Sequence, residues 1–388
     1  MINGNLKAGF EKIFGKGGDI RGFFAPGRVN LIGEHIDYNG GHVFPCALSV
    51  GNYCVARARN DDKLCFYSEN FKKGGVITTS INDLVFDSTL GWTNYPKGVM
   101  WAFDKKGMKM THGFDIYIYG NIPGSGLSSS AAMEVVIGVM LKDYFGFDVS
   151  MQDIALIGQY SENNFNGMNC GIMDQFASAM GKKDHAIFLD CSTLKYEYVP
   201  LKLVGYKIIV TNSNKPHSLC NSHYNDRRKE CEEAVKDLQT VVDIKNLCQL
   251  TPEQFDKYQN VIKSPISKRR AFFAINEEKR TKDAVEALKK NDIETFGKLI
   301  KEAGTSLRYD YEATCDEIDV LVDEANKQPG CLGSRETGGG WGGNTVSIVK
   351  DDCIDAFKKE VGMVYKKKTG LKADFYSLEI GDGGRRIF

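Results

Sequence analysis

The sequence predicts an α+β protein built from two domains. The chain has 388 residues, which is long for a single domain. Its first half alternates strand patterns with glycine-rich turns, whereas residues 225–326 are rich in Lys and Glu at helical spacing. The pattern changes near residues 201–212. We therefore expect an N-terminal domain of residues 1–200 and a C-terminal domain of residues 201–388.

The individual elements follow from hydrophobic periodicity. Residues 1–18 have the pattern of an amphipathic helix, and residues 114–119 alternate as a strand. The segment SSAAMEVVIGVMLKDYF is apolar on nearly all sides and ends at Gly146, which predicts a buried helix with a glycine cap. Near the C-terminus, NTVSIV, DDCIDAFKKEVGMVYKKKTG and ADFYSLEI predict a strand, a helix and a strand.

Composition narrows the classes of partner. Lys plus Arg and Asp plus Glu number 50 each, so net charge gives no reason to expect nucleic acid or a membrane surface as a partner. The longest apolar stretches are too short to span a bilayer, and the N-terminus lacks the pattern of a signal peptide. The 11 cysteines form no C-x-x-C pair. We expect reduced thiols and a cytoplasmic location.

The first of three glycine-rich segments is APGRVNLIGEHIDYNGG, residues 25–41. It places Arg28, Glu34, His35 and Asp37 within ten residues. A charged surface loop is the ordinary interpretation. The density of hydrogen-bonding groups beside glycines instead favours a site for a polyhydroxylated ligand, because a sugar needs several convergent donors and acceptors.

The second segment, PGSGLSSSA (residues 123–131), follows a predicted strand and begins a predicted helix. Free backbone N–H groups at a helix start bind phosphate, and glycines allow close approach. One serine hydroxyl could also bind Mg²⁺. A serine N-cap on a core helix and a dinucleotide site are the alternatives. The segment matches neither G-x-G-x-x-G nor the P-loop pattern.

The third segment, GSRETGGGWGGNT (residues 333–345), has five glycines around one Trp just before a predicted strand. Such a run usually permits tight turns or close approach to a ligand. Two acidic residues add candidates for chemistry: Asp174 in the first turn of a predicted helix, and Glu162 on the preceding helix. Taken singly, each is most simply a dipole-stabilising or solvated residue.

Together these segments resemble the GHMP kinases, and within that superfamily the galactokinases. GRVNLIGEHIDYNGG is similar to the galactokinase signature, PGSGLSSSA to the nucleotide-binding motif, and TGGGWGG to the third motif. CGIMDQ, LRYDYEATCDEID and the terminal GDGGRR are similar as well. The resemblance covers nearly the whole chain in order, so it is highly specific.

The resemblance implies a two-domain GHMP kinase fold with the active site in the cleft between the domains, and ATP-dependent phosphorylation of galactose at its anomeric hydroxyl. Asp174 and Arg28 would be catalytic, and Mg²⁺ would be held by Ser130 and Glu162. The sugar would contact Glu34, His35, Ile36, Asp37 and Tyr224. The nucleotide would contact Ser68, Gly124, Ser125, Gly126, Leu127, Ser128, Ser129 and Ser130.

The sequence also departs from the family pattern. Pro123 runs straight into Gly124, and Ile36, Glu336, Trp341 and Asn344 replace commoner residues. These differences concern fine sugar specificity and not the class of reaction. Three alternatives remain open. An N-acetylgalactosamine kinase shares the motif set, a galactose-sensing regulator shares the fold without catalysis, and a nicotinamide-dependent oxidoreductase shares only the strand–glycine–helix order. Retention of Ser130 and Ala131 favours the enzyme over the regulator.

Overall fold

The N-terminal part of the protein is built on a six-stranded sheet. The computed structural model describes residues 2–123, 126–215 and 220–388, with the side chains of residues 220–222 excluded. The strand order is β13-β1-β3-β6-β4-β5, antiparallel except for the β4–β6 pair. The strands are β1 (Ile20–Asn30), β3 (Pro45–Ala58), β4 (Lys63–Ser68), β5 (Ile77–Ser80), β6 (Phe114–Gly120) and β13 (Arg385–Arg386).

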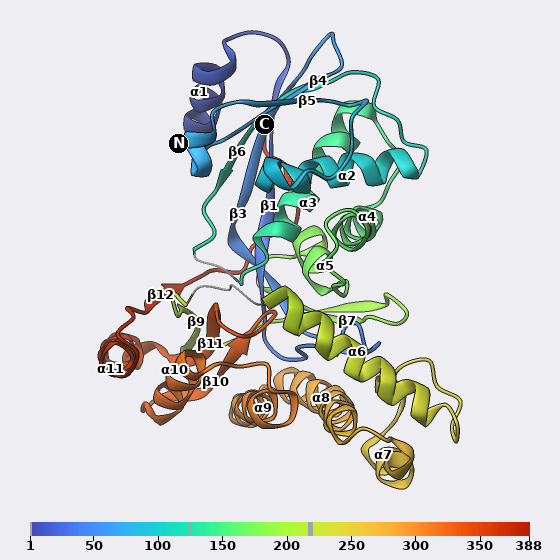
Figure 1. Cartoon of the computed structure of the whole chain (residues 1–388). Helices are drawn as coiled ribbons and strands as arrows, with labels where there is room; N and C mark the ends of the chain where they lie inside the picture. The colour runs from blue at the N-terminus through green and yellow to red at the C-terminus, as the bar shows by residue number, and fades with distance from the viewer. Residues whose placement is uncertain (1, 124–125, 216–219) are drawn as a thin grey trace.

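Helices cover both faces of this sheet (Figure 1). On one face lies α1 (Ile2–Phe14), whose Leu6 and Phe10 pack against Tyr53, Val55 and Tyr117. On the other face lie α2 (Asn94–Lys105), α3 (Ser129–Phe145), α4 (Met151–Asn164) and α5 (Met173–Met180). Both faces are therefore apolar, and the predicted N-terminal helix, the strand at 114–119 and the buried helix ending at Gly146 are confirmed.

The second part combines a four-stranded sheet with helices. Its strand order is β10-β11-β9-β12, all antiparallel. The strands are β9 (Tyr206–Asn212), β10 (Cys331–Thr337), β11 (Asn344–Lys350) and β12 (Asp374–Ser377). The helices are α6 (Cys220–Leu238), α7 (Pro252–Tyr258), α8 (Pro265–Lys289), α9 (Ile293–Ser306), α10 (Asp316–Lys327) and α11 (Ile354–Thr369). The predicted strand–helix–strand ending is confirmed as β11, α11 and β12.

Short elements complete the description. A three-stranded sheet joins β2 (His42–Val43), β7 (His185–Asp190) and β8 (Tyr196–Pro200). The 3₁₀ turns are η1 (Glu69–Gly74), η2 (Ser88–Thr93), η3 (Leu247–Gln249), η4 (Gln259–Val261) and η6 (Asp351–Cys353), and η5 (Leu307–Tyr311) is a π-helical turn.

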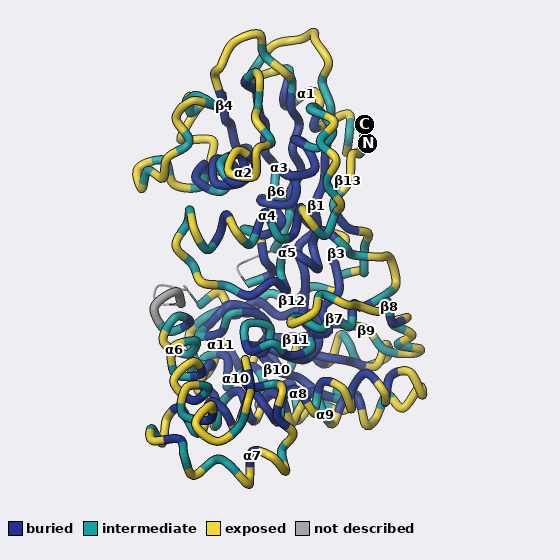
Figure 2. The backbone as a smooth tube through the Cα atoms, turned by 90° about the vertical axis from the view of Figure 1, so that its right-hand side faces the viewer, coloured by how far each residue is buried: buried dark blue, intermediate teal, exposed yellow. Residues whose placement is uncertain are grey.

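The two ends of the chain meet at the first sheet. β13 pairs with β1 through Phe23 and Phe24, although it lies more than 350 residues further along the chain. Figures 1 and 2 show both termini beside that sheet, and Figure 2 shows buried backbone running through both halves of the molecule. The predicted change near 201–212 coincides with the start of the second sheet, but the last residues return to the first. Among the described helices, none combines the length and apolarity needed to cross a membrane.

Candidate active site

The three glycine-rich segments converge on one cavity of about 290 Å³. Arg28 and the turn after β1 come from the first segment, Gly126 and the start of α3 from the second, and Gly338 and Gly339 from the third. The cavity walls include the predicted residues Arg28, Glu34, His35, Asp37, Gly126, Ser128, Ser129, Ser130, Asp174 and Tyr224. Segments more than 300 residues apart in sequence thus form a single site.

Arg28 and Asp174 form a two-pronged ion pair in this cavity. Arg28 Nε donates to Asp174 Oδ1 at 2.7 Å, and its Nη2 donates to Oδ2 at 2.8 Å. The arginine side chain is 3% exposed and the aspartate 32%, so the carboxylate faces the open space while the guanidinium lies behind it. This geometry holds the carboxylate in one orientation.

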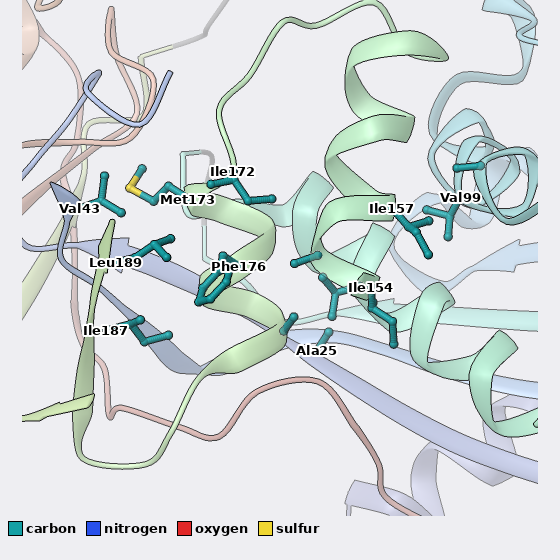
Figure 3. Close-up of a cluster of buried hydrophobic side chains, with 14 of the residues drawn as sticks. Ala25, Val43, Val99, Ile154, Ile157, Ile172, Met173, Phe176, Ile187 and Leu189 are labelled. Carbon is teal, nitrogen blue, oxygen red and sulfur yellow. The ribbon is translucent and has the colours of Figure 1, made fainter. Parts of the chain in front are cut away.

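The core fixes the position of Asp174. The residue lies in the first turn of α5, as predicted. Its neighbour Met173 and the buried Phe176 pack with Val43 and Leu189 of the second and seventh strands (Figure 3). Because Met173 and Phe176 anchor this helix in the core, Asp174 has little freedom to move.

Close backbone approach joins the second and third segments. Gly126 has φ +91° and Gly338 φ +100°, both in the left-handed region. A Cβ atom on Gly338 would lie 2.9 Å from the Gly126 carbonyl oxygen. That same carbonyl accepts a hydrogen bond of 3.0 Å from Arg28 Nη1. Glycine is therefore required at these positions, and the contact brings both loops against the Arg28–Asp174 pair.

Glu34 is buried and half satisfied. Its Oε1 accepts hydrogen bonds from Thr337 Oγ1 at 3.1 Å, Gly338 N at 2.9 Å and Arg335 Nη2 at 3.3 Å. Its Oε2 has no hydrogen-bond partner among the described residues. Leaving a buried carboxylate oxygen without a hydrogen bond costs free energy of folding. This oxygen is therefore suited to accept a hydrogen bond from a hydroxyl group of a ligand.

His35 and Asp37 lie beside Glu34, and burial shifts the pKa of each of these two side chains. Burial, together with Arg227 and Arg335, lowers the pKa of His35 to about 3, so its imidazole is neutral at physiological pH. Burial and the negative charge of Asp174 raise the pKa of Asp37 to about 6. Asp37 Oδ1 accepts a 2.9 Å hydrogen bond from Tyr38 N.

Two further predicted sugar residues differ in placement. Tyr224, on α6, lines the cavity, and its ring packs 5.3 Å from that of His35. Ile36 is fully buried in the main hydrophobic core and is not among the residues that line the cavity. The structure thus places the Ile36 side chain behind the sugar-binding turn.

A second cavity, of about 310 Å³, adjoins the first through the shared residues Tyr95, Ser129 and Ser130. Ser68 lines it, as predicted for a nucleotide contact. Its other walls were not predicted: Asn52, Asn70, Phe71, Trp92, Tyr95, Ile118, Ile122 and Met133. Phe71 and Trp92 stack with ring centroids 6.4 Å apart and planes 14° from parallel. A flat ligand with an apolar face suits such a pocket.

The remaining predicted nucleotide residues occupy the start of α3. Ser128 caps this helix with φ +58° and donates to Asp174 Oδ2 at 2.5 Å. Leu127 is buried, and its carbonyl accepts from Arg28 N. Gly124 and Ser125 lie outside the described residues, so their predicted contacts stay predictions. The structure adds to the prediction for Ser128 a contact with the candidate base.

Two buried glutamates lie side by side next to the serine loop. Glu162 on α4 is buried rather than solvated, and Glu134 on α3 is its neighbour. Burial raises the pKa of both carboxyls, and so does the negative charge of Asp174. The charge of Glu162 raises the pKa of Glu134 further, whereas a hydrogen bond from Glu134 lowers that of Glu162. Glu134 Oε2 accepts from Gln175 Nε2 at 2.9 Å, whereas among the described residues Glu134 Oε1 and Glu162 Oε2 form no hydrogen bond outside this pair of glutamates.

This donor set fits a hard divalent cation shared with a phosphate ligand. Carboxylate and hydroxyl oxygens are ligands of the kind that Mg²⁺ takes, and Mg²⁺ is usually held by one or two protein groups plus phosphates and waters. Glu134 lies one helical turn after Ser130 on α3, although neither glutamate is among the residues that line the two cavities. Over the described part of the chain, no cluster of three or more His, Cys, Asp or Glu side chains is arranged as a complete metal cage. A site with few protein ligands agrees with that finding.

The two-part fold, with a polar cavity walled by a carboxylate, a serine-rich helix start and glycine-rich turns, has the features of a small-molecule kinase of the GHMP type. The chain matches the GHMP kinase N-terminal domain over residues 94–182, the galactokinase galactose-binding signature over residues 8–58 and the GHMP kinase C-terminal domain over residues 284–362. It is 51% identical to the galactokinase of Fusobacterium nucleatum and 48% identical to that of Bacillus subtilis, over 99% and 98% of both chains. The chain belongs to the galactokinase family of GHMP kinases.

Solved structures agree. The crystal structure of Lactococcus lactis galactokinase complexed with galactose superposes with a TM-score of 0.98 at 42% identity, covering 100% of both chains. The mevalonate kinase of Methanococcus jannaschii has a TM-score of 0.65 at 18% identity, covering 94% of this chain and 99% of that chain, and shares the fold. The predicted family and fold class are confirmed.

Proposed function

We propose that this protein transfers the γ-phosphoryl group of ATP to the anomeric hydroxyl of galactose, giving galactose 1-phosphate and ADP. The observation that carries the proposal is the position of Asp174. Its carboxylate, held by Arg28, lies in a polar cavity that opens through shared serines onto an aromatic one. Full-length identity of about 50% to galactokinases supports the same reaction.

The polar cavity is the sugar site. Glu34 and Asp37 offer carboxylate oxygens as acceptors, and His35 and Tyr224 add groups that can hydrogen-bond and pack against the ring. These groups are already fixed by protein contacts, so little ordering is required when the sugar binds. Because the acceptors have fixed directions, glucose, whose C4 hydroxyl is inverted, would leave buried polar atoms unpaired.

The aromatic cavity is the nucleotide site. The adenine base would lie between the apolar walls around Phe71 and Trp92, and the phosphates would extend toward the N-terminal end of α3. Free backbone N–H groups at that end favour anions. Ser129 and Ser130, which line both cavities, then lie where the γ-phosphate meets the sugar.

The chain's own residues supply alignment and charge. Asp174 accepts the proton of the anomeric hydroxyl and orients that oxygen, and Ser128 and Arg28 hold the carboxylate still. Arg28 also lies beside the path of the phosphoryl group and balances its charge. Ser130 and Glu162 would hold Mg²⁺, which neutralises phosphate charge when bound.

We place this reaction in the cytoplasm, with ATP and a sugar as the small-molecule partners and neither nucleic acid nor membrane involved. The cysteines within the described residues are free thiols, which suits a reducing compartment. The retained Ser130 and the paired Arg28–Asp174 favour catalysis over a purely sugar-sensing role.

The test is ADP release by the purified protein with ATP, Mg²⁺ and a panel of galactose, N-acetylgalactosamine, glucose and no sugar. We expect turnover with galactose and little with glucose. Absence of sugar-dependent ADP release would overturn the kinase proposal. A higher kcat/KM for N-acetylgalactosamine than for galactose would change the substrate and leave the reaction class intact.

A further inference from the structure

A chain of hydrogen bonds runs behind the sugar site from His35 into the core. His35 Nδ1 lies 2.9 Å from the Tyr38 hydroxyl, which lies 2.6 Å from the Tyr311 hydroxyl. The Tyr311 hydroxyl in turn lies 3.4 Å from Cys231 Sγ. Tyr38, Tyr311 and Cys231 are absent from the walls of the sugar cavity, so they act on the sugar through residues that do line it, His35 among them.

Asn39 sets the direction of this chain at its inner end. Its Nδ2 donates to the His35 carbonyl at 2.9 Å and to Cys231 Sγ at 3.6 Å. The amide is fixed in this orientation because a carbonyl can only accept. Cys231 Sγ therefore accepts from Asn39. Burial raises the pKa of the Cys231 thiol to about 11, so its own proton remains available to donate.

We infer that this chain holds His35 as the neutral tautomer protonated at Nε2, so that it serves the sugar as a hydrogen-bond donor. Each proton then has an acceptor: Cys231 donates to Tyr311, Tyr311 to Tyr38, and Tyr38 to His35 Nδ1. If the chain ran the other way, His35 Nδ1 would donate to Tyr38, Tyr38 to Tyr311 and Tyr311 to Cys231. Neither Asn39 Nδ2, which is a donor, nor the Tyr311 hydroxyl, which would already donate to the sulfur, could then accept the thiol proton. The inference rests on the proposed sugar site.

The outer end of the ring agrees with this assignment. His35 Nε2 is a buried atom, and the contact of the ring with the Gly339 backbone favours a proton on it. Glu34 and Asp37, the other groups of this turn, supply acceptors. The carboxylates can accept a hydrogen bond from a sugar hydroxyl. A neutral histidine beside them can donate one to a hydroxyl oxygen, so the site can bind hydroxyl groups in both ways.

An irregular helical turn brings Tyr311 to this place. η5 is a π-helical turn, and such turns are frequent at functional sites. The Tyr311 ring packs on Phe273 at 4.3 Å, and its carbonyl accepts from Arg227 Nε at 2.8 Å. Arg227 lies one turn after Tyr224 on α6, so the same turn steadies a second residue of the sugar site. Tyr38 and Tyr311 are positioning residues.

The test combines a spectrum with a binding measurement on the full chain. The protein would be labelled with ¹⁵N-histidine, and long-range ¹H–¹⁵N correlation would report which ring nitrogen carries the proton. The six histidines are resolved by comparison with His35→Gln. Tyr38→Phe and Tyr311→Phe remove the two hydroxyls and keep the rings. Tyr309→Phe is the matched control, because Tyr309 lies on the same turn with an exposed side chain.

We expect His35 in the wild-type protein to be protonated at Nε2. Tyr38→Phe should shift its resonances most and weaken galactose binding about three- to tenfold. Tyr311→Phe should act in the same direction but less, and Tyr309→Phe not at all, with ATP affinity unchanged in all three. An Nδ1-protonated or charged His35, or a Tyr38→Phe protein indistinguishable from Tyr309→Phe, would overturn the inference. Unchanged galactose affinity in His35→Gln would instead overturn the sugar-site proposal, whatever the spectrum shows.

Discussion

The two connected cavities are built in opposite ways. In the sugar cavity, polar side chains are held by other protein groups: the buried Glu34 by Thr337 and Gly338, and the partly exposed Asp174 by Arg28. In the nucleotide cavity, the walls are mostly apolar or aromatic, and Phe71 is 60% exposed. The fixed polar groups of the sugar cavity can distinguish the directions of sugar hydroxyls, because a wrongly placed hydroxyl leaves a buried polar group without a hydrogen bond. The nucleotide cavity provides flat area with few directional contacts.

This difference predicts where substitutions act. Changes in the sugar cavity should alter turnover and sugar recognition steeply, because each polar group has several fixed partners. Changes in the aromatic cavity should alter ATP affinity more gently. The Arg28–Asp174 pair lines the polar cavity, where the proposed transfer takes place, so its loss should have the largest effect.

Asp174→Asn should lower kcat by about 10²- to 10⁴-fold while galactose still binds. The amide keeps the size of the side chain but cannot accept the hydroxyl proton, and it loses the charge that pairs with Arg28. Single-turnover phosphoryl transfer and equilibrium dialysis with labelled galactose measure the two effects separately. Lost sugar binding with residual turnover preserved would contradict the role of Asp174.

Glu162→Gln should raise the Mg²⁺ concentration needed for half-maximal activity by about tenfold or more. The substitution removes one anionic ligand and keeps the shape of the side chain. Glu134→Gln is the matched control: it changes the neighbouring carboxyl, which already accepts from Gln175, and should move the Mg²⁺ requirement much less. Mn²⁺ titration followed by electron paramagnetic resonance measures metal binding without turnover. If both variants raised the Mg²⁺ requirement equally, the assignment of Glu162 rather than Glu134 as the metal ligand would be contradicted.

Sequence reasoning predicted more of the residues that line the polar cavity than of those that line the aromatic cavity. Arg28, Glu34 and Asp37 lie in one segment dense with charged residues beside glycines, so local composition marked them. The partnership of Arg28 with Asp174, 146 residues away, follows from the resemblance and not from spacing. The return of β13 to β1 had no local signal, because a two-residue strand carries no periodicity.

The aromatic walls and Glu134 were missed for different reasons. Phe71 and Trp92 belong to short 3₁₀ turns, where apolar residues are ordinarily read as local packing. Glu134 did carry a signal. It is the one charged residue between Ala131 and Leu141 of a helix otherwise apolar on all sides, and a buried charge in such a helix calls for a partner.

Trp92→Ala should raise the KM for ATP about tenfold and leave the KM for galactose unchanged. Stacking of a base on an aromatic side chain is worth on the order of 1–3 kcal/mol. Trp101→Ala is the control, because Trp101 stacks on Tyr160, 5.4 Å away, and does not line the cavity. Steady-state kinetics with each substrate varied will show the effect. If only the KM for galactose rose, the proposal that the aromatic cavity binds ATP would be contradicted.

Galactose affinity should fall several-fold as pH decreases from 7.5 to 5.5. Burial and Asp174 raise the pKa of Asp37 to about 6, so the carboxyl gains a proton in this range and loses acceptor capacity. Because a native carboxyl with a raised pKa keeps its proton longer than the unfolded chain does, Asp37 also costs stability as pH rises through about 6. Asp37→Asn should flatten both profiles. An unchanged galactose dissociation constant across this range in the wild-type protein would contradict the assignment.

Trp341→Phe should have the smallest effect on activity, less than about threefold. Its tryptophan fluorescence should show whether galactose and ATP bind in different cavities. Trp341 lies 6.0 Å from His35 and 5.4 Å from His223, measured between ring centroids, whereas Trp92 lines the nucleotide cavity. Phe keeps an aromatic ring there and loses only the hydrogen bond from Nε1 to the Glu312 carbonyl. Since the chain has three tryptophans, Trp341→Phe should abolish most of the galactose-induced change and keep the ATP-induced one, and Trp92→Phe should do the reverse. A galactose signal that survives in full in Trp341→Phe would show that the third glycine-rich segment does not respond to the sugar.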